Sequence, residues 1–158
     1  MGNRADGDGC TGPDGYVMHS GYQLDADHGC IALARHRAAA FLDQAAAKHG
    51  LSVSARTRDL TQLVVSELVT NARKYAPGPA WMELRVNARA VDVVVADSHT
   101  AVPTARAADP ARIGQHGLEI VEAVTESLLI EKGPAGKRIT ARLVLSDRPP
   151  PGLNRADQ

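Results

Sequence analysis

The pattern of apolar and polar positions predicts two long helices in the first half of the chain. From Ile31 to His49, strong helix formers carry an apolar stripe, and Gly50 supplies a stop. A second helix begins near Ser54, whose hydroxyl can cap free backbone amides, and runs to about Ala76, where a Pro-Gly-Pro sequence follows. The residues expected to face the core are Ile31, Leu33, Ala34, Ala38, Phe41, Leu42 and Ala45 in the first helix and Leu60, Leu63, Val64, Leu68, Ala72 and Tyr75 in the second.

Five shorter runs have the composition of β-strands. They are Tyr16–Leu24, Trp81–Ala88, Val91–Asp97, Ser127–Glu131 and Arg138–Leu145. The second and third runs form one predicted antiparallel hairpin, and the last two form another. The first run is predicted to be an edge strand. The run Val91–Asp97 is nearly all apolar, which favours a central position in the sheet. In the last run every second residue is apolar, so Ile139, Ala141, Leu143 and Leu145 are expected to point inward.

The order of these elements predicts an α+β fold. Residues 98–114 show no clear period and are expected to form a loop, and Gly117–Glu126 restarts a helix with Leu118, Val121 and Val124 on one face. The whole pattern favours a two-layer sandwich, with a mixed but mostly antiparallel sheet and the helices on one face. Residues 1–15 and 147–158 are rich in Gly, Pro and Asp, which predicts a flexible leader and a flexible tail around one domain at 16–146.

Composition and charge exclude several classes of protein. A chain of 158 residues that is 44% hydrophobic and 23% charged is typical of one globular domain. Eighteen Lys and Arg balance 18 Asp and Glu, so no net positive field attracts nucleic acid or an anionic membrane. No apolar run is long enough to span a bilayer, and the leader lacks the apolar centre of a secretory signal. We therefore expect a cytoplasmic protein that binds neither nucleic acid nor membrane directly.

The candidate chemistry begins in the segment SELVTNARKYAPGP, residues 66–79. On a helix, Glu67 and Asn71 stack on one face, offset from the apolar stripe, and Lys74 or Tyr75 continues the column. A carboxylate, an amide oxygen and a cation in a column suit a metal-bound polyphosphate. Asn71 can offer an oxygen to Mg²⁺, Lys74 can meet a phosphate, and Glu67 can accept a proton from a nucleophile. A solvated helix face with one Glu–Lys pair explains the same pattern equally well.

Two further features point to a nucleotide. Asp97 ends the apolar central strand, where its carboxylate can hydrogen-bond the exocyclic amine and ring nitrogen of a base, although an Asp there is also a common turn former. Further along, Gly114 and Gly117 precede an amphipathic helix, whose amide dipoles favour an anion at its start. Two glycines before a helix also form an ordinary turn.

Together, in this order and spacing, these features resemble the GHKL (histidine kinase-like) ATPase superfamily. Within it, the chain is similar to the small stand-alone ATP-binding proteins related to anti-sigma-factor serine kinases, over roughly residues 16–145. The segment ELVTNARKY resembles the N box, E-x-x-x-N-x-x-K followed by an aromatic residue or His. The resemblance implies the Bergerat ATP-binding fold, with ATP and Mg²⁺ as cofactors. It also implies that Glu67 is the catalytic base, that Asn71 holds the metal, and that Lys74 touches phosphate.

The resemblance implies roles for further residues. Asp97 corresponds to the adenine-binding Asp of the box D-x-G-x-G-x-P. Gly114, His116, Gly117 and Leu118 match the second glycine box, which closes over the nucleotide. The closing strand of the family offers a Thr to the adenine region, and the nearest Thr in this chain is Thr140, two residues beyond the aligned Arg138.

The function implied by the resemblance is that of an anti-sigma regulator in transcription. Such a protein transfers the γ-phosphoryl group of ATP to a serine of a STAS-type anti-anti-sigma partner and otherwise sequesters a sigma factor, and dimerisation of the free form stays open. An autophosphorylating sensor kinase is not expected, because His19, His28, His36 and His49 are scattered and only about thirty residues stand before the predicted helix pair in this sequence.

Two alternatives stay open beside this function. His99 and Ala101 stand where the first glycine box carries Gly, which favours weak nucleotide binding. The first alternative is therefore a catalytically weak or silent module of the same fold that sequesters a regulatory partner. The second is an ATPase subunit of another signalling complex.

Overall fold

The computed structural model describes residues 15–25, 29–75, 79–97, 117–134 and 136–146. The strands are β1 (Met18–Leu24), β2 (Ala80–Val86), β3 (Ala90–Asp97), β4 (Ser127–Gly133) and β5 (Gly136–Val144). The helices are α2 (Cys30–His49), α3 (Ala55–Tyr75) and a short helix at residues 117–124. All the predicted helices and strands are therefore present. The predicted loop at 98–114, the predicted tail and residues 1–14 of the predicted leader lie outside the described residues.

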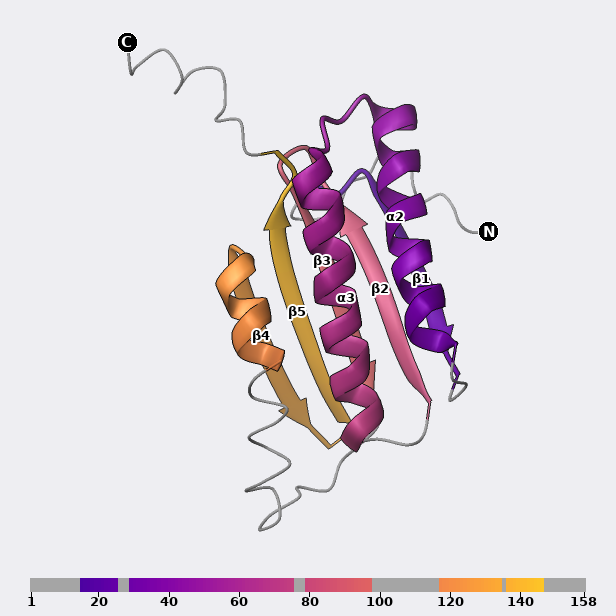
Figure 1. Cartoon of the computed structure of the whole chain (residues 1–158), viewed down its shortest axis with the longest axis vertical. Helices are drawn as coiled ribbons and strands as arrows, with labels where there is room; N and C mark the ends of the chain where they lie inside the picture. Colours follow the sequence, from indigo (N-terminus) through magenta and orange to yellow (C-terminus); the bar gives the residue numbers. More distant parts are fainter. Residues whose placement is uncertain (1–14, 26–28, 76–78, 98–116, 135, 147–158) are drawn as a thin grey trace.

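The strands form one five-stranded sheet in the order β1-β2-β3-β5-β4, with β1 at an edge and β3 at the centre, as the sequence predicts. All four pairings are antiparallel, so the described sheet is not mixed. The strands β3 and β4 run in the same direction, but β5 lies between them. Helices α2 and α3 lie side by side over one face of the sheet, α2 against β1 and β2 and α3 against β3 and β5 (Figure 1). The predicted α+β fold is confirmed.

The ends of the two long helices follow the predicted local signals. The backbone N–H of Thr57 donates to the Oγ of Ser54 at 3.0 Å, which caps α3. Gly50 ends α2 in the left-handed region, with φ of 66°, and its N–H donates to the carbonyl of Ala46. Glycine adopts this conformation without the steric cost that a Cβ atom adds.

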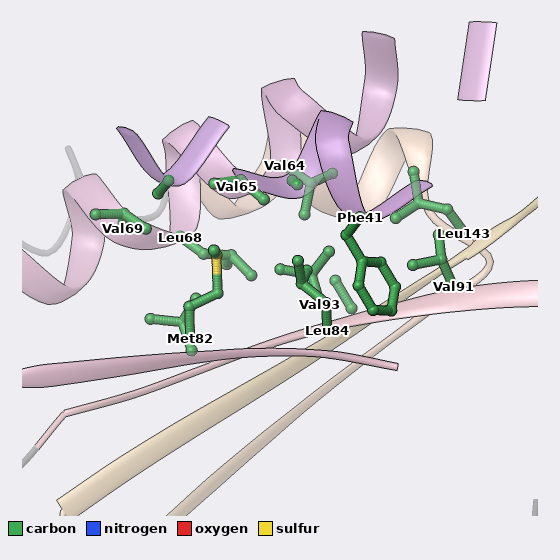
Figure 2. Close-up of a cluster of buried hydrophobic side chains, with 14 of the residues drawn as sticks. Phe41, Val64, Val65, Leu68, Val69, Met82, Leu84, Val91, Val93 and Leu143 are labelled. Carbon is green, nitrogen blue, oxygen red and sulfur yellow. The ribbon is translucent and has the colours of Figure 1, made fainter. Parts of the chain in front are cut away.

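The core fills the space between the helices and the sheet, and it is aliphatic apart from one ring (Figure 2). Phe41, Val64 and Leu68 from the helices meet Met82 and Leu84 from β2, together with side chains of β3 and β5. Burying such side chains stabilises a fold by about 1.5–3 kcal/mol each.

Two predicted core residues, Leu33 and Leu63, are exposed. Leu33 precedes Ala34, which is fully buried, and adjacent helical positions lie about 100° apart around the axis. Leu63 likewise precedes the fully buried Val64. The buried stripes of α2 and α3 are therefore narrower than the apolar stripes in the sequence.

The two faces of the sheet differ in what covers them. Alternate residues of β3 point to opposite faces, so Val91, Val93 and Val95 face the helices, whereas Asp92 and Val94 face away from them. No described helix covers this outer face. Trp81 of β2 lies on it and is 54% exposed. In the described part of the chain, no helix is long and apolar enough to cross a membrane.

A network of charged and polar side chains fills part of the outer face. The carboxylate of Asp92, only 2% exposed, accepts hydrogen bonds from Arg142 at 2.8 and 3.1 Å and from the hydroxyl of Tyr16. Arg85 approaches the same carboxylate to 3.8 Å and lies over the Tyr16 ring. The hydrogen bond to Asp92 raises the pKa of Arg142 above its usual value. This network joins β2, β3, β5 and the segment before β1.

Candidate functional site

The second half of α3 carries the column of polar side chains that the sequence predicts. Glu67 and Asn71 are four residues apart and Lys74 follows three residues later, so they lie along one side of the helix. Asn71 is only 6% exposed, Glu67 is half-buried and Lys74 is exposed. The amide of Asn71 is thus held inside the protein, whereas Lys74 reaches the surface.

Asp97, at the end of β3, lies on the face of the sheet that the helices cover. It is 7% exposed, and its register partner on β5 is Lys137. Cross-strand partners share a face of the sheet, so Lys137 also lies on the helix side. The Nζ of Lys137 donates a hydrogen bond to the Oδ1 of Asn71 at 3.0 Å. The last turns of α3, the end of β3 and the start of β5 therefore meet in one polar cluster.

Two features of the environment of Lys137 change its pKa in opposite directions. Burial lowers the pKa of Lys137, because desolvation disfavours the ammonium form, and the negative charge of Asp97 acts against this effect. The cluster therefore contains a lysine ammonium that has lost part of its water and contacts a buried amide oxygen.

Gly117 places the short helix directly against Glu67. A Cβ atom at position 117 would lie 2.7 Å from the Oε1 of Glu67, closer than real Cβ contacts. Glycine therefore allows the start of the helix at 117–124 to approach the carboxylate. The buried Val121 and the half-buried Leu118 pack this helix onto the core. A carboxylate and a helix start thus meet beside the Asn71 column.

The structure brings together some of the predicted site residues and not others. Glu67 and Gly117 lie side by side, and Asn71 and Asp97 both belong to the cluster around Lys137. Leu118 packs against the core. Gly114 and His116 lie outside the described residues.

The prediction for Thr140 needs a correction. Thr140 pairs with Val94, so it lies on the outer face of the sheet, opposite to Asp97. Its strand instead contributes Lys137, which the sequence analysis missed. The sequence does indicate its orientation. Lys137 lies two residues before Ile139, so it points to the same face as Ile139, Ala141 and Leu143.

The oxygen donors of the cluster fit Mg²⁺ only in part. Amide and carboxylate oxygens are the hard ligands that Mg²⁺ prefers, and this ion is usually held by one or two protein oxygens together with phosphates and water. Among the described residues, no group of three or more His, Cys, Asp or Glu side chains is arranged to hold a metal. The Oδ1 of Asn71 already accepts a hydrogen bond from Lys137. A magnesium ion here would depend chiefly on the phosphates of a bound nucleotide.

Fold and site together define a small α+β domain with a carboxylate, an amide and a lysine gathered at one end of an antiparallel sheet. Residues 26–143 match the family model of the histidine kinase-like ATPase domain. The match spans well over half of the chain, so the protein belongs to this family. A search of curated proteins finds no match to the chain. The family match supports an ATP-binding module of the GHKL type.

Proposed function

We propose that the protein binds ATP at the polar cluster and transfers the γ-phosphoryl group to a serine or threonine of a STAS-type anti-anti-sigma protein. The protein also sequesters a sigma factor when the transfer does not occur, and it acts in the cytoplasm. The observation that carries the proposal is the contact between Glu67 and the helix start at Gly117, next to the cluster of Asn71, Asp97 and Lys137. The family match supports the nucleotide part of the proposal.

The proposed transfer is a displacement at phosphorus. The hydroxyl oxygen of the acceptor serine bonds to the γ-phosphorus, while the bond from that phosphorus to the oxygen bridging to the β-phosphate breaks and ADP leaves. The carboxylate of Glu67 accepts the hydroxyl proton. Its half-buried position next to the helix start limits the access of water to this carboxylate.

Positive charge near the phosphates comes from two lysines of this chain. Lys74 is exposed on α3, and Lys137 lies at the start of β5. Both can compensate negative charge on the transferring group. Asn71 would hold a magnesium ion, which supplies further neutralisation of the phosphates when bound.

Asp97 is the residue proposed to recognise the base. Its carboxylate is nearly buried, so a hydrogen bond to an exocyclic amine is shielded from water. A titration with a fluorescent ATP analogue in the presence of MgCl₂ tests this role. We expect Asp97→Asn to weaken binding about tenfold or more, because an amide presents an N–H group where a carboxylate accepts. Asp59→Asn, an exposed site on α3, is the control and should bind as the wild type does. Equal binding by all three proteins would refute the assignment of Asp97.

The kinase step is tested with labelled ATP and a STAS-type protein from the same genome. We expect label on the acceptor with the wild type and a loss of about 100-fold or more with Glu67→Gln, which cannot accept the proton. Glu122→Gln changes an exposed glutamate of the short helix and should leave the transfer unchanged. Transfer that survives Glu67→Gln would rule out this residue as the base.

One observation favours the silent binding module as a second candidate. The Oδ1 of Asn71 already has a partner within the chain, the ammonium of Lys137. A site that keeps this contact is poorly suited to a metal-dependent transfer. Formation of a stable complex with the STAS-type protein, with no label transferred by the wild type, would favour this candidate over the kinase.

A further inference from the structure

The contact between Lys137 and Asn71 sets this lysine apart from its neighbour. The neighbour is Lys132 of β4, which pairs with Lys137 across the β4–β5 hairpin. The side chain of Lys132 is exposed, as is usual for a lysine. Lys137 instead turns inward, beside Asp97 and onto the amide of Asn71. The two residues are close in space and equal in charge, but only one of them lies in the candidate site.

Placing an ammonium group in this position has a cost, because the group loses hydration. The cost is offset by the hydrogen bond to Asn71 and by the negative charge of Asp97. A lysine that served only solubility would gain nothing from this position, so its placement indicates a role in the site.

We propose that Lys137 is a built-in cation of the nucleotide site, which contacts the phosphates of bound ATP and competes with a divalent metal for the Oδ1 of Asn71. The inference rests on the proposed ATP binding and adds to it. Two cations at one amide oxygen repel each other, so a metal ion at Asn71 requires the ammonium of Lys137 to move. The affinity for the nucleotide should therefore depend less on a divalent metal than it would if the Oδ1 of Asn71 accepted no hydrogen bond from Lys137.

The test compares affinity for a fluorescent ATP analogue in EDTA and in MgCl₂. We expect the wild type to bind in EDTA with an affinity within about tenfold of that in MgCl₂, because the ammonium of Lys137 then supplies part of the positive charge that the metal would supply. Lys137→Met should widen this difference by about tenfold or more, chiefly by weakening the binding in EDTA. Lys132→Met removes an equal charge from the exposed neighbouring position, which acts on Lys137 only through space, so its effect on this difference should be much smaller than that of Lys137→Met.

A second measurement reports on the metal directly. Electron paramagnetic resonance follows the uptake of Mn²⁺ by the protein with ADP bound. We expect Lys137→Met to take up Mn²⁺ at a concentration about tenfold lower than the wild type, because the amide oxygen of Asn71 is then open to the ion. Lys137→Gln is the second variant: it keeps a hydrogen-bond donor without the charge, and it replaces Lys137→Met if that protein does not fold.

The outcomes separate this inference from the proposed function. If the wild type binds the analogue and Asp97→Asn weakens the binding, but Lys137→Met and Lys137→Gln show the metal dependence of the wild type, the inference is wrong and the ATP-binding function stands. If the wild type binds in neither EDTA nor MgCl₂, both are wrong. A wider gap between the affinities in EDTA and in MgCl₂ in both Lys137 variants, with a much smaller change for Lys132→Met, supports the role of Lys137.

Discussion

Two aspartates on the same strand, Asp92 and Asp97, are both almost fully buried but have different surroundings. The carboxylate of Asp92, on the outer face, accepts two hydrogen bonds from Arg142 and one from Tyr16, with Arg85 close by. Asp97 lies on the helix-covered face at the end of the strand, beside a lysine that contacts the amide of Asn71. They are five residues apart, and an odd separation places side chains on opposite faces of a strand.

The difference indicates that Asp92 serves stability, and it supports the proposed role of Asp97 in binding. The partners of Asp92 come from distant parts of the chain and hold its carboxylate from several sides, which leaves little room for a ligand. Asp97 lies at the strand end, where the polar residues of α3 and β5 meet. Burial alone therefore does not identify a functional carboxylate. The residues that surround the carboxylate, and the space that they leave for a ligand, are more informative.

Asp92→Asn should have the largest effect on stability. It leaves the two arginines without a neutralising charge, and we expect a loss of about 3 kcal/mol in the free energy of unfolding, measured by urea denaturation. Nucleotide binding by the folded fraction should not change. Asp43→Asn is the control, because Asp43 pairs with Arg58 at 3.0 Å on the surface, and its effect should be much smaller. Equal losses of unfolding free energy for Asp92→Asn and Asp43→Asn would show that the buried network of Asp92 is no more stabilising than a surface ion pair.

Tyr16→Phe removes one partner of Asp92 and should cost about 1 kcal/mol at neutral pH. Burial, together with the hydrogen bond to Asp92, raises the pKa of Tyr16 above its usual value of 10.0. The folded protein therefore holds this proton more tightly than the unfolded chain. The resulting stability is fully present below pH 10.0 and is lost as the pH rises through the pKa of the folded state. Urea denaturation above pH 10.0 should show a smaller decline for Tyr16→Phe than for the wild type; equal declines would contradict the assignment.

Asp97→Asn should cost about 1 kcal/mol of stability, less than Asp92→Asn, because Asp97 lies at a strand end beside Lys137, whereas Asp92 holds two arginines and a tyrosine. The same variant is expected to lose nucleotide affinity. Thermal unfolding and the nucleotide titration, carried out on one preparation, separate the two effects. A loss of stability as large as that of Asp92→Asn would place Asp97 among the structural carboxylates.

Gly117→Ala should have the smallest effect on stability, within about 0.5 kcal/mol, because among the described residues the added methyl group meets the flexible end of the Glu67 side chain. The displaced carboxylate should nevertheless lower the rate of phosphoryl transfer. Gly29→Ala is the control, because no atom of the described residues lies within 4 Å of a Cβ atom at that helix start. A transfer rate that is equal in both variants would show that the position of Glu67 is unimportant.

Much of the fold can be predicted from the sequence because its signals are local. The apolar periods of α2 and α3, the cap at Ser54 and the stop at Gly50 each depend on residues a few positions apart. The column of Glu67 and Asn71 is predictable for the same reason, since helix geometry fixes it. The exposed Leu33 shows the limit, because the width of a buried stripe depends on what packs against it.

Contacts between distant segments could not be predicted in this way. The network around Asp92 joins residues separated by 50 and 76 positions, and no periodicity in one strand indicates such partners. For Lys137, strand parity predicts only the inward face, because it alternates with Ile139 and Ala141; its place beside Asp97 follows from the register of β3 and β5. The family pattern instead predicts a threonine on the same strand, but Thr140 lies on the opposite face. A motif indicates which residue type to look for, and the sheet register decides which side chain lies there.

The position of Trp81 gives the protein a built-in optical reporter. It is the single tryptophan of the chain, it pairs with Ala96 next to Asp97, and its indole lies on the opposite side of the sheet from the proposed nucleotide. Its emission can therefore be recorded without interference from direct stacking on a base. A shift in that emission when unlabelled ATP is added would mean that the strand ends move, and that the outer face of the sheet responds to occupancy of the site across one layer of backbone.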